Sequence, residues 1–308
     1  MPTNRRRFLG RVAALTPLTS VLARTQAPGP LHLSCNEYTW SVYFGRDNRR
    51  FGEHLDTDLA EVAASGLDGF EPSGASVEQI TRMGRNLDDR KLEMRSLYVN
   101  SELHDPVRAE ESIRAVLRIA GAAKALGTRI VVTNPSPLRW GGPENKSDQQ
   151  LEVQARNLNT LGRELAALGL KLAYHNHDIE IRAAAREFHH MMLGTDPDHV
   201  HLCLDAHWVY RGAGNSAVAL FDIVRLYAAR IVELHVRQSQ DGVWTEIFSP
   251  RGDVDYPRLV ADLVDRNVRP LVVLEQAIES GSPKTLNALE AHRRSVAEAR
   301  KVFAPLAG

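Results

Sequence analysis

The sequence predicts a single (β/α)8 TIM barrel, and three observations support this fold class. From residue 31 onward, eight short apolar runs alternate with longer segments in which apolar residues recur every three or four positions. Eight such units in roughly 275 residues match a closed barrel in both count and length. No Pro/Gly-rich linker divides residues 28–308, so we expect them to form one domain.

The predicted strands are apolar runs bounded by turn-forming residues. They are Leu31–Asn36, Leu67–Glu71, Leu92–Tyr98, Arg129–Thr133, Leu170–His175, Val200–Leu204, Ile231–Val236 and Pro270–Glu275. The competing fold is a doubly wound open sheet, which usually carries a Gly-rich phosphate loop after its first strand. Glu37 and Tyr38 follow the first predicted strand instead. The closed barrel is therefore favoured.

Helix signals between the strands indicate repeated strand–helix units. The segment Ser147–Leu168 has leucines and alanines along one face, a capping box that begins at Ser147, and a following Gly169 suited to a left-handed cap. The segment Glu110–Leu126 ends in Gly127, and the next strand follows at once. This direct transition from helix to strand is typical of parallel sheets.

Residues 1–27 are organised differently and predict a twin-arginine signal peptide. Arg5–Arg7 precede Phe8-Leu9, a weakly apolar run extends to Ala23, and small residues end the segment at Ala27. We therefore expect a periplasmic protein, or one otherwise exported by the twin-arginine route. The apolar run is too short and interrupted to span a bilayer comfortably. No stable membrane insertion is expected after cleavage.

Composition excludes some classes of partner and leaves others open. Without the five arginines of residues 1–27, 33 basic residues stand against 38 acidic ones. Nucleic-acid binding needs a concentrated basic face, so we expect no such partner. Cys35 and Cys203 are the only cysteines, which indicates no disulfide framework, although one bridge between them stays open. Homo-oligomer formation is also left open.

Four consecutive predicted strands end in an imidazole or a carboxylate. His175 and His177 share one face at the end of the fifth strand, Asp205 follows the sixth, His235 lies in the seventh and Glu275 ends the eighth. Carboxyl ends of barrel strands meet at one rim, where active sites lie. Asp205 and Glu275 follow strongly apolar runs, and a buried carboxylate there needs a charged partner or a metal. The pattern predicts one divalent metal ion (Mn, Co, Zn, Mg or Fe).

Three further residues are candidates for substrate binding. Glu71 ends the second strand and is expected at the same rim, where it can bind substrate or pair with a neighbouring cation. Arg237 lies two residues beyond His235, where it can stabilise an oxyanion. Trp208 is suited to covering a sugar ring, with a packing role as the alternative, and Trp244 has the same two readings.

The sequence resembles the xylose isomerase-like sugar phosphate isomerase/epimerase superfamily over roughly residues 30–303. Within it the chain is similar to the exported branch that carries a twin-arginine signal. The segments that carry the resemblance are Tyr174–Asp178, Leu202–Asp205 with Trp208, Glu233–Arg237, Gly252–Tyr256 and Leu274-Glu275. Each segment alone is weak, and their order and spacing together are specific.

The resemblance implies metal ligands at Asp205, His235 and Glu275, with Glu275 also acting as an acid/base group. Most relatives have a glutamate as fourth ligand at the end of strand five, where this chain has His175. The family's pair of glutamate acid/base groups is therefore incomplete. His175, His177 or Glu180 can replace the missing proton carrier, since imidazole titrates near neutrality.

Such a site predicts an isomerase or epimerase of an unphosphorylated sugar, keto-sugar or inosose that works through an enediolate intermediate. A lyase that resembles inosose dehydratase or eliminates from a keto-glycoside shares the first step and is the main alternative. A non-catalytic carbohydrate-binding barrel is a second alternative. A phosphodiesterase resembling endonuclease IV would need more metal ligands and a basic groove, which the acidic mature chain does not favour.

Overall fold

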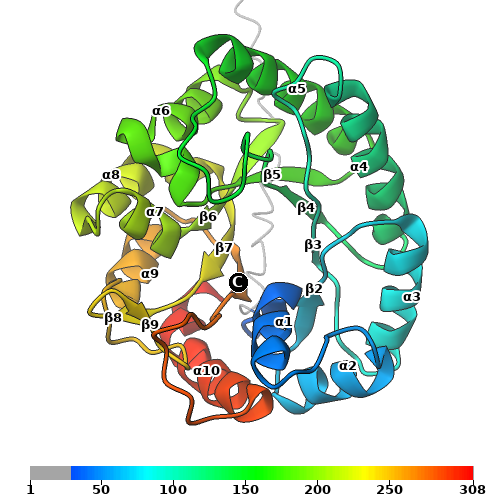
Figure 1. The fold of residues 1–308 in the computed structure, drawn as a ribbon, viewed down its shortest axis with the longest axis vertical. Helices are drawn as coiled ribbons and strands as arrows, with labels where there is room; N and C mark the ends of the chain where they lie inside the picture. Colours follow the sequence, from blue (N-terminus) through cyan, green and yellow to red (C-terminus); the bar gives the residue numbers. More distant parts are fainter. Residues whose placement is uncertain (1–28, 308) are drawn as a thin grey trace, which may run out of the picture.

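The computed structural model describes residues 29–307 and forms one eight-stranded parallel barrel with helices around it (Figure 1). The fold prediction is confirmed. The predicted signal peptide, residues 1–27, lies outside the described residues. Within the described part of the chain, no helix has the length and apolar character needed to cross a membrane.

Every predicted strand is present, and most begin one to four residues later than the apolar pattern indicates. The strands are β1 (Leu33–Asn36), β2 (Gly69–Glu71), β3 (Ser96–Tyr98), β4 (Ile130–Thr133), β5 (Lys171–His175), β6 (Val200–Asp205), β7 (Ile231–Val236) and β10 (Leu271–Leu274). Their order in the sheet is β2-β1-β10-β7-β6-β5-β4-β3. Parallel neighbours in this order bring the carboxyl ends to one rim.

Contacts between the segments of β2 and β3 close the barrel. The amide of Phe70 donates to the carbonyl of Glu93 at 2.9 Å, and the amide of Tyr98 donates to the carbonyl of Pro72 at 3.1 Å. A Cβ atom on Gly69 would lie 2.6 Å from the Glu93 carbonyl oxygen. Only glycine therefore allows the backbones to approach this closely at the seam.

Helices surround the strands and cover the outer face of the barrel (Figure 1). They are α1 (Glu37–Arg46), α2 (Leu55–Ala64), α3 (Val77–Asp88), α4 (Ala109–Lys124), α5 (Asp148–Ala167), α6 (Asp178–Gly194), α7 (Ala206–Gly212), α8 (Ala217–Tyr227), α9 (Tyr256–Asp265) and α10 (Ala288–Phe303), with 3₁₀ turns η1 (Ala228–Arg230) and η2 (Ala304–Leu306). A short hairpin of β8 (Ser239–Gln240) and β9 (Val243–Trp244) follows β7.

Helix α5 begins and ends as the sequence predicts. The Ser147 hydroxyl accepts from the amide of Gln150, and the Gln150 side chain accepts from the amide of Ser147, which completes the capping box. Gly169 has a φ of 74°, in the left-handed region. The buried face of α5 carries Leu151, Leu158, Leu161 and Leu165. Helix packing on the barrel therefore follows from the apolar period.

Helix α6 contains an unusual kink near its start. Ala183, Ala184 and Ala185 have φ angles of 55°, 58° and 55°, so three consecutive alanines are left-handed. The preceding Arg182 donates from Nη1 to the carbonyl of Gly142 at 2.8 Å and from Nε to Asn145 Oδ1 at 2.8 Å. The guanidinium thereby ties the kink to the loop between β4 and α5.

Candidate active site

The four predicted metal ligands converge at the carboxyl ends of their strands. One donor atom each from His175, Asp205 and Glu275 lies within 4.8 Å of the other two. His235 Nδ1 lies 2.6 Å from Glu275 Oε2, and the His175 and His235 ring centroids are 4.6 Å apart. All four side chains are buried. Strands far apart in the sequence therefore supply one compact set of nitrogen and oxygen donors.

Arg237 links the two carboxylates of this set. Its Nη2 lies 3.3 Å from Asp205 Oδ2 and also contacts Glu275 Oε1. The guanidinium carbon lies 4.7 Å from the ring centroid of Trp208 and 4.4 Å from that of Trp244. Arg237 is fully buried, so the two indoles and the two acids fix its position.

Backbone and amide contacts hold the carboxylates in place. Asn36 Nδ2 donates to Glu275 Oε2 at 2.8 Å. Asn176 accepts from the amide of Asp205 and donates to its carbonyl, both at 3.1 Å. The amide of Trp208 donates to Asp205 Oδ1 at 2.9 Å, because Asp205 is also the N-cap of α7. The donor atoms are thus preorganised.

Burial and neighbouring charges set the protonation of the site. Burial opposes ionisation of Glu275, but the Arg237 cation and His235 hold the pKa of Glu275 well below its ordinary range. Burial raises the pKa of Asp205 to about 6 despite the nearby guanidinium. Burial lowers the pKa of His175 strongly and that of His177 to about 4. Both imidazoles are therefore neutral near pH 7 and have a lone pair to offer.

A second polar layer lies below these residues, inside the barrel. His235 Nε2 lies 3.1 Å from Glu71 Oε1 and 3.2 Å from Glu233 Oε1, and all three side chains are fully buried. Burial by itself lowers the pKa of His235, but the surrounding acids raise it well above its ordinary value. The Cys203 thiol, 3.7 Å from Glu233, stays protonated because burial raises its pKa.

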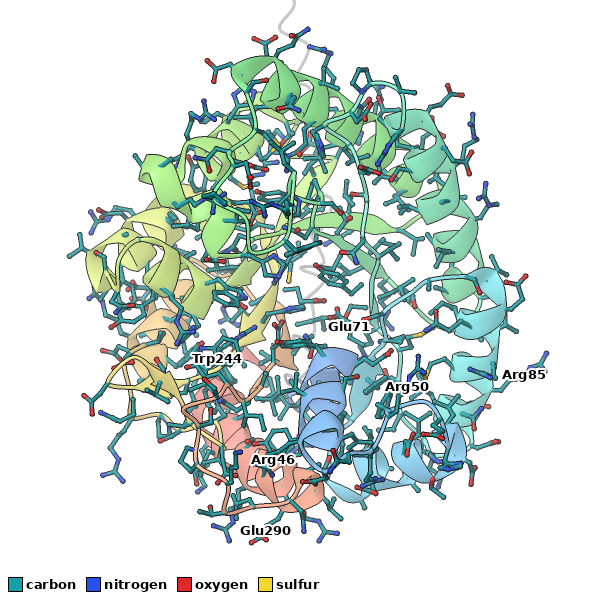
Figure 2. The ribbon with its side chains drawn as sticks, in the orientation of Figure 1. Arg46, Arg50, Glu71, Arg85, Trp244 and Glu290 are labelled. Atoms are coloured by element: carbon teal, nitrogen blue, oxygen red, sulfur yellow. The ribbon has the colours of Figure 1, made fainter. Side chains whose placement is uncertain are left out.

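Glu71 occupies a different place from the one expected for a substrate-binding group. Figure 2 shows it toward the middle of the barrel, whereas Arg85 lies at the outer edge. It is fully buried against His235 and does not line the cavity at the rim. Glu71 is nevertheless the last residue of β2, and its carboxylate faces the His235 imidazole, so pairing with a neighbouring cation describes its contacts and a role in substrate binding stays a prediction.

A cavity of 410 Å³ opens above the converged residues. Its lining combines aromatic, amide and acidic side chains: Asn36, Tyr38, Ser73, Tyr98, Asn100, Trp140, His175, His177, Asp178, Trp208 and Glu275. The Trp140 and His177 rings meet edge to face, with centroids 5.2 Å apart. His177 Nδ1 and Trp208 Nε1 have no hydrogen-bond partner among the described residues. Aromatic faces and unpaired polar atoms suit a polyhydroxylated ring.

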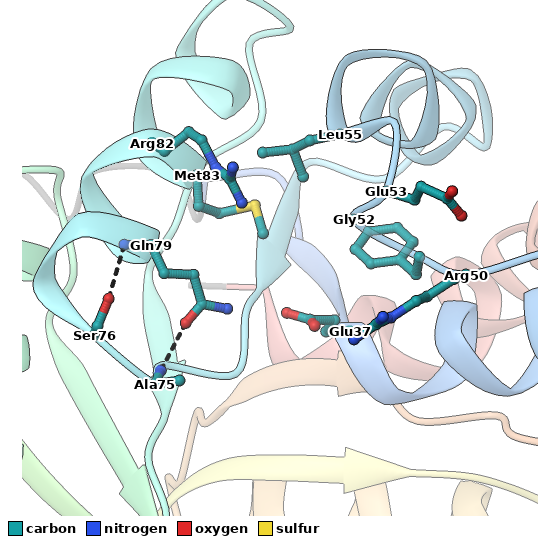
Figure 3. Close-up of a pocket in the computed structure, with 11 residues that line it drawn as sticks. Glu37, Arg50, Gly52, Glu53, Leu55, Ala75, Ser76, Gln79, Arg82 and Met83 are labelled. Carbon is teal, nitrogen blue, oxygen red and sulfur yellow. Dashed lines mark hydrogen bonds between the residues drawn. The ribbon is translucent and has the colours of Figure 1, made fainter.

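A larger cavity of 650 Å³ lies beside this one, between the α1–α2 loop and α3 (Figure 3). Its lining includes Glu37, Arg50, Phe51 and Gln79, and none of the predicted site residues. The amide of Ser73 donates to Glu37 Oε2 at 3.1 Å, across the wall between the two cavities. Chemistry is therefore placed in the smaller cavity, where the metal-ligating types gather.

The donor set fits a divalent transition metal. His175 Nδ1 is buried and lacks a hydrogen-bond partner, which is costly unless another group uses its lone pair. His175, Asp205 and Glu275 have donor atoms within 4.8 Å of one another, and His235 contacts Glu275 at 2.6 Å, which is a mixed nitrogen/oxygen set of the kind that binds Mn²⁺, Zn²⁺, Co²⁺ or Fe²⁺. The residues that would hold the ion are His175, Asp205, His235 and Glu275.

Comparison with known proteins identifies the family of the chain. The family model described as xylose isomerase-like TIM barrel matches residues 59–301. The chain belongs to this family. Inosose dehydratase of Salmonella agona is 25% identical over 257 residues, which cover 75% of this chain and 83% of the relative. Inosose dehydratase of Geobacillus kaustophilus is 26% identical, with 73% and 81% covered.

Solved structures share the xylose isomerase-like fold. A sugar phosphate isomerase/epimerase from Parabacteroides distasonis superposes with a TM-score of 0.68 at 17% identity, covering 95% of this chain and 100% of that one. The 3-keto-D-glucoside 4-epimerase from E. coli superposes with a TM-score of 0.65 at 17% identity, covering 88% and 99%. At these identities the similarity concerns the fold.

Several residues of this xylose isomerase-like site were not found from the sequence. Asn36, Glu233 and the close packing of Trp244 on Arg237 have no distinct motif, although Asn36 does end the first predicted strand. Glu180, considered as a proton carrier, accepts from the amide of His177 at 2.6 Å and from Asn134 at 3.2 Å, and burial raises its pKa to about 7, so this role stays a prediction. Cys35 and Cys203 are both free and buried.

Proposed function

We propose that this protein is a metal-dependent enzyme that removes a proton next to the carbonyl of an unphosphorylated keto-sugar or inosose. The observation that carries the proposal is the convergence of His175, Asp205, His235 and Glu275 below the 410 Å³ cavity. Return of the proton to the other face gives epimerisation, and its return to the neighbouring carbon gives isomerisation. Sugar epimerases among the structures of the same fold support this direction.

The cavity lining favours a substrate without a phosphate group. Asp178 and Glu275 are acidic, and the lining contains no lysine or arginine side chain. A phosphate dianion there would meet like charges, and the nearby Arg237 guanidinium is already paired with Asp205 and Glu275. Hydroxyl groups, in contrast, find donors and acceptors in Asn36, Asn100 and Ser73.

The chain's own residues supply proton transfer and orientation. His177 is neutral near pH 7 and lines the cavity, so it can accept a proton from the substrate. Glu275 faces the same cavity as the second acid/base group. The indole N–H of Trp208 is free to donate to a developing oxyanion. A divalent cation in the site supplies Lewis acidity, which makes the C–H beside a carbonyl more acidic.

Dehydration is the second candidate, and the curated relatives named inosose dehydratase favour it. Loss of a hydroxyl group from the carbon next to the deprotonated one needs an acid on the leaving group. His177, once it carries a proton, is placed at the cavity to deliver it. Both candidates begin with the same proton removal, so one experiment tests the shared step.

The test is deuterium uptake from D₂O by a panel of keto-sugars and inososes, followed by proton NMR and mass spectrometry. We expect metal-loaded protein to introduce deuterium at one carbon beside the carbonyl of at least one compound. A product with the same elemental composition as the substrate identifies an epimerase or isomerase, and a product that has lost water identifies a dehydratase. Absence of label across the panel, with metal bound, would contradict the proposal.

Two variants accompany the test. Glu275→Gln should abolish uptake and weaken metal binding, because it removes a charged donor and an acid/base group together. Glu290→Gln, on the outer part of α10 (Figure 2), removes a carboxylate remote from the cavity and should leave uptake unchanged. Metal content by mass spectrometry of protein purified without chelator separates an enzyme from a carbohydrate-binding barrel that lacks the ion.

Export is proposed separately, on the arrangement of residues 1–27. Arg5, Arg6 and Arg7 with the following apolar run support a twin-arginine signal. Replacing Arg6 and Arg7 by lysines should hold the precursor in the cytoplasm, whereas the unchanged chain should reach the periplasm. Cell fractionation with N-terminal sequencing checks this, and a mature protein that still begins at Met1 would contradict it.

A further inference from the structure

The two nitrogens of His235 face different surroundings. Nδ1 lies 2.6 Å from Glu275 Oε2, and Glu275 belongs to the group of donor atoms that it forms with His175 and Asp205. Nε2 points the other way, with Glu71 Oε1 at 3.1 Å and Glu233 Oε1 at 3.2 Å. One side of the ring therefore belongs to the metal site and the other belongs to a pair of acids inside the barrel.

These two acids are unusual in a barrel interior, which is generally filled by branched apolar side chains. Glu71 extends from β2 and Glu233 from β7, and both are fully buried. Apart from the imidazole, Glu71 and the second oxygen of Glu233 have no hydrogen-bond donor among the described residues. Two buried acidic groups with one shared imidazole partner are a costly arrangement, and burial together with the neighbouring Glu71 raises the pKa of Glu233 to about 8. A positioning role toward His235 accounts for that cost.

We propose that Glu71 and Glu233 are positioning residues that keep a proton on His235 Nε2 and direct the bare Nδ1 at the metal. This inference rests on the proposed function, because it concerns the cation held by His235 and Glu275. It assigns a role to two residues that do not touch the substrate cavity.

The chemistry follows from how imidazole binds a metal. A neutral ring that coordinates through one nitrogen carries its proton on the other, and a carboxylate acceptor fixes the ring orientation and increases the basicity of the ligand. A pair of contacts from two different strands, β2 and β7, also restricts rotation of the ring about its Cβ–Cγ bond. A glutamine in place of either acid remains similar in size, but its amide can donate to Nε2 and favour the wrong tautomer.

The experiment compares Co²⁺ affinity in three variants: Glu71→Gln, Glu233→Gln and the control Glu187→Gln. Glu187 is also a largely buried acid, paired with Lys146 at 2.7 Å on the outer layer. Competition with a chromophoric chelator gives the dissociation constant, and the visible Co²⁺ spectrum reports the ligand geometry. We expect affinity about 10–100-fold weaker for the first two variants, with a shifted spectrum, and no change for the control.

A second measurement does not depend on the variants folding. Unaltered protein loaded with Zn²⁺ should show, in nitrogen-15 NMR of labelled histidine, His235 coordinated through Nδ1 with the proton on Nε2. Coordination through Nε2 would overturn the inference, as would unchanged Co²⁺ affinity in both variants. Failure of the unaltered protein to bind Co²⁺ or Zn²⁺ would instead refute the proposed function, so the two failures are distinguishable.

Discussion

Replacing Arg237 by methionine isolates the contribution of the buried cation at the centre of the site. Methionine keeps an unbranched apolar stem near Trp208 and Trp244, but it removes the guanidinium charge that links Asp205 and Glu275. The change leaves two fully buried carboxylates without their guanidinium. Stability, measured without metal, should therefore decrease strongly.

The magnitude follows from burial. Breaking a buried ion pair by removing one partner costs about 3–5 kcal/mol, because the remaining charge stays uncompensated. At about 2 °C per kcal/mol for a chain of this size, the melting temperature should fall by about 6–10 °C. Arg211→Met is the matched control, since Arg211 also stacks on Trp244 but pairs with Glu279 at a partly exposed site. Arg211→Met should decrease the free energy of unfolding by about 1 kcal/mol or less.

Thermal unfolding followed by circular dichroism, in chelator and in Mn²⁺, provides the assay. In chelator, we expect the full decrease for Arg237→Met. In Mn²⁺ we expect a smaller one, because a bound cation compensates the same two carboxylates. A decrease below about 2 °C in chelator, or one equal to that of Arg211→Met, would refute the idea that the guanidinium neutralises these acids.

Three further predictions concern the fold. Burial lowers the pKa of His292 from 6.5 to about 4, so below pH 6.5 the unfolded chain binds a proton that the folded chain does not. The free energy of unfolding should therefore decrease by about 3 kcal/mol as the pH falls from 6.5 to 4, and His292→Gln should flatten the pH dependence of the unfolding midpoint in this range. Gly69→Ala should destabilise by about 1–3 kcal/mol in urea unfolding, because the added methyl meets the Glu93 carbonyl, and an unchanged midpoint would contradict the tight seam. Ser147→Ala should lower the free energy of unfolding by about 1 kcal/mol in the same assay, because it removes the N-cap of α5, whereas Ser147→Thr should keep most of that stability.

The barrel and the rim residues were predictable because they depend on local patterns. Eight apolar runs separated by helical periods define the strand order, and parallel strands place their carboxyl ends together. The structure accordingly brings His175, Asp205 and Glu275 together and places His235 in contact with Glu275. Their roles as metal ligands and acid/base groups remain predictions, which the metal and exchange measurements test.

Contacts across the barrel were not predictable from local patterns. Glu71 ends β2, and its distance from a β7 imidazole depends on the curvature of the closed sheet, which no sequence spacing encodes. The Trp244 contact with Arg237 depends on the β8–β9 hairpin, whose two-residue strands are too short to give a period. Tertiary geometry decides both.

The three alanines of α6 reverse the usual ranking of residues in helices. Alanine is the most favourable residue in a right-handed turn, but each L-residue in a left-handed one costs roughly 1–2 kcal/mol, and glycine is free of this penalty. At Ala183, Ala184 and Ala185 the Cβ atom thus disfavours the left-handed backbone conformation that the residue adopts. The anchoring of Arg182 to the β4–α5 loop opposes relaxation to the ordinary hand. Glycine at these three positions would therefore favour the native turn, although it weakens a right-handed helix.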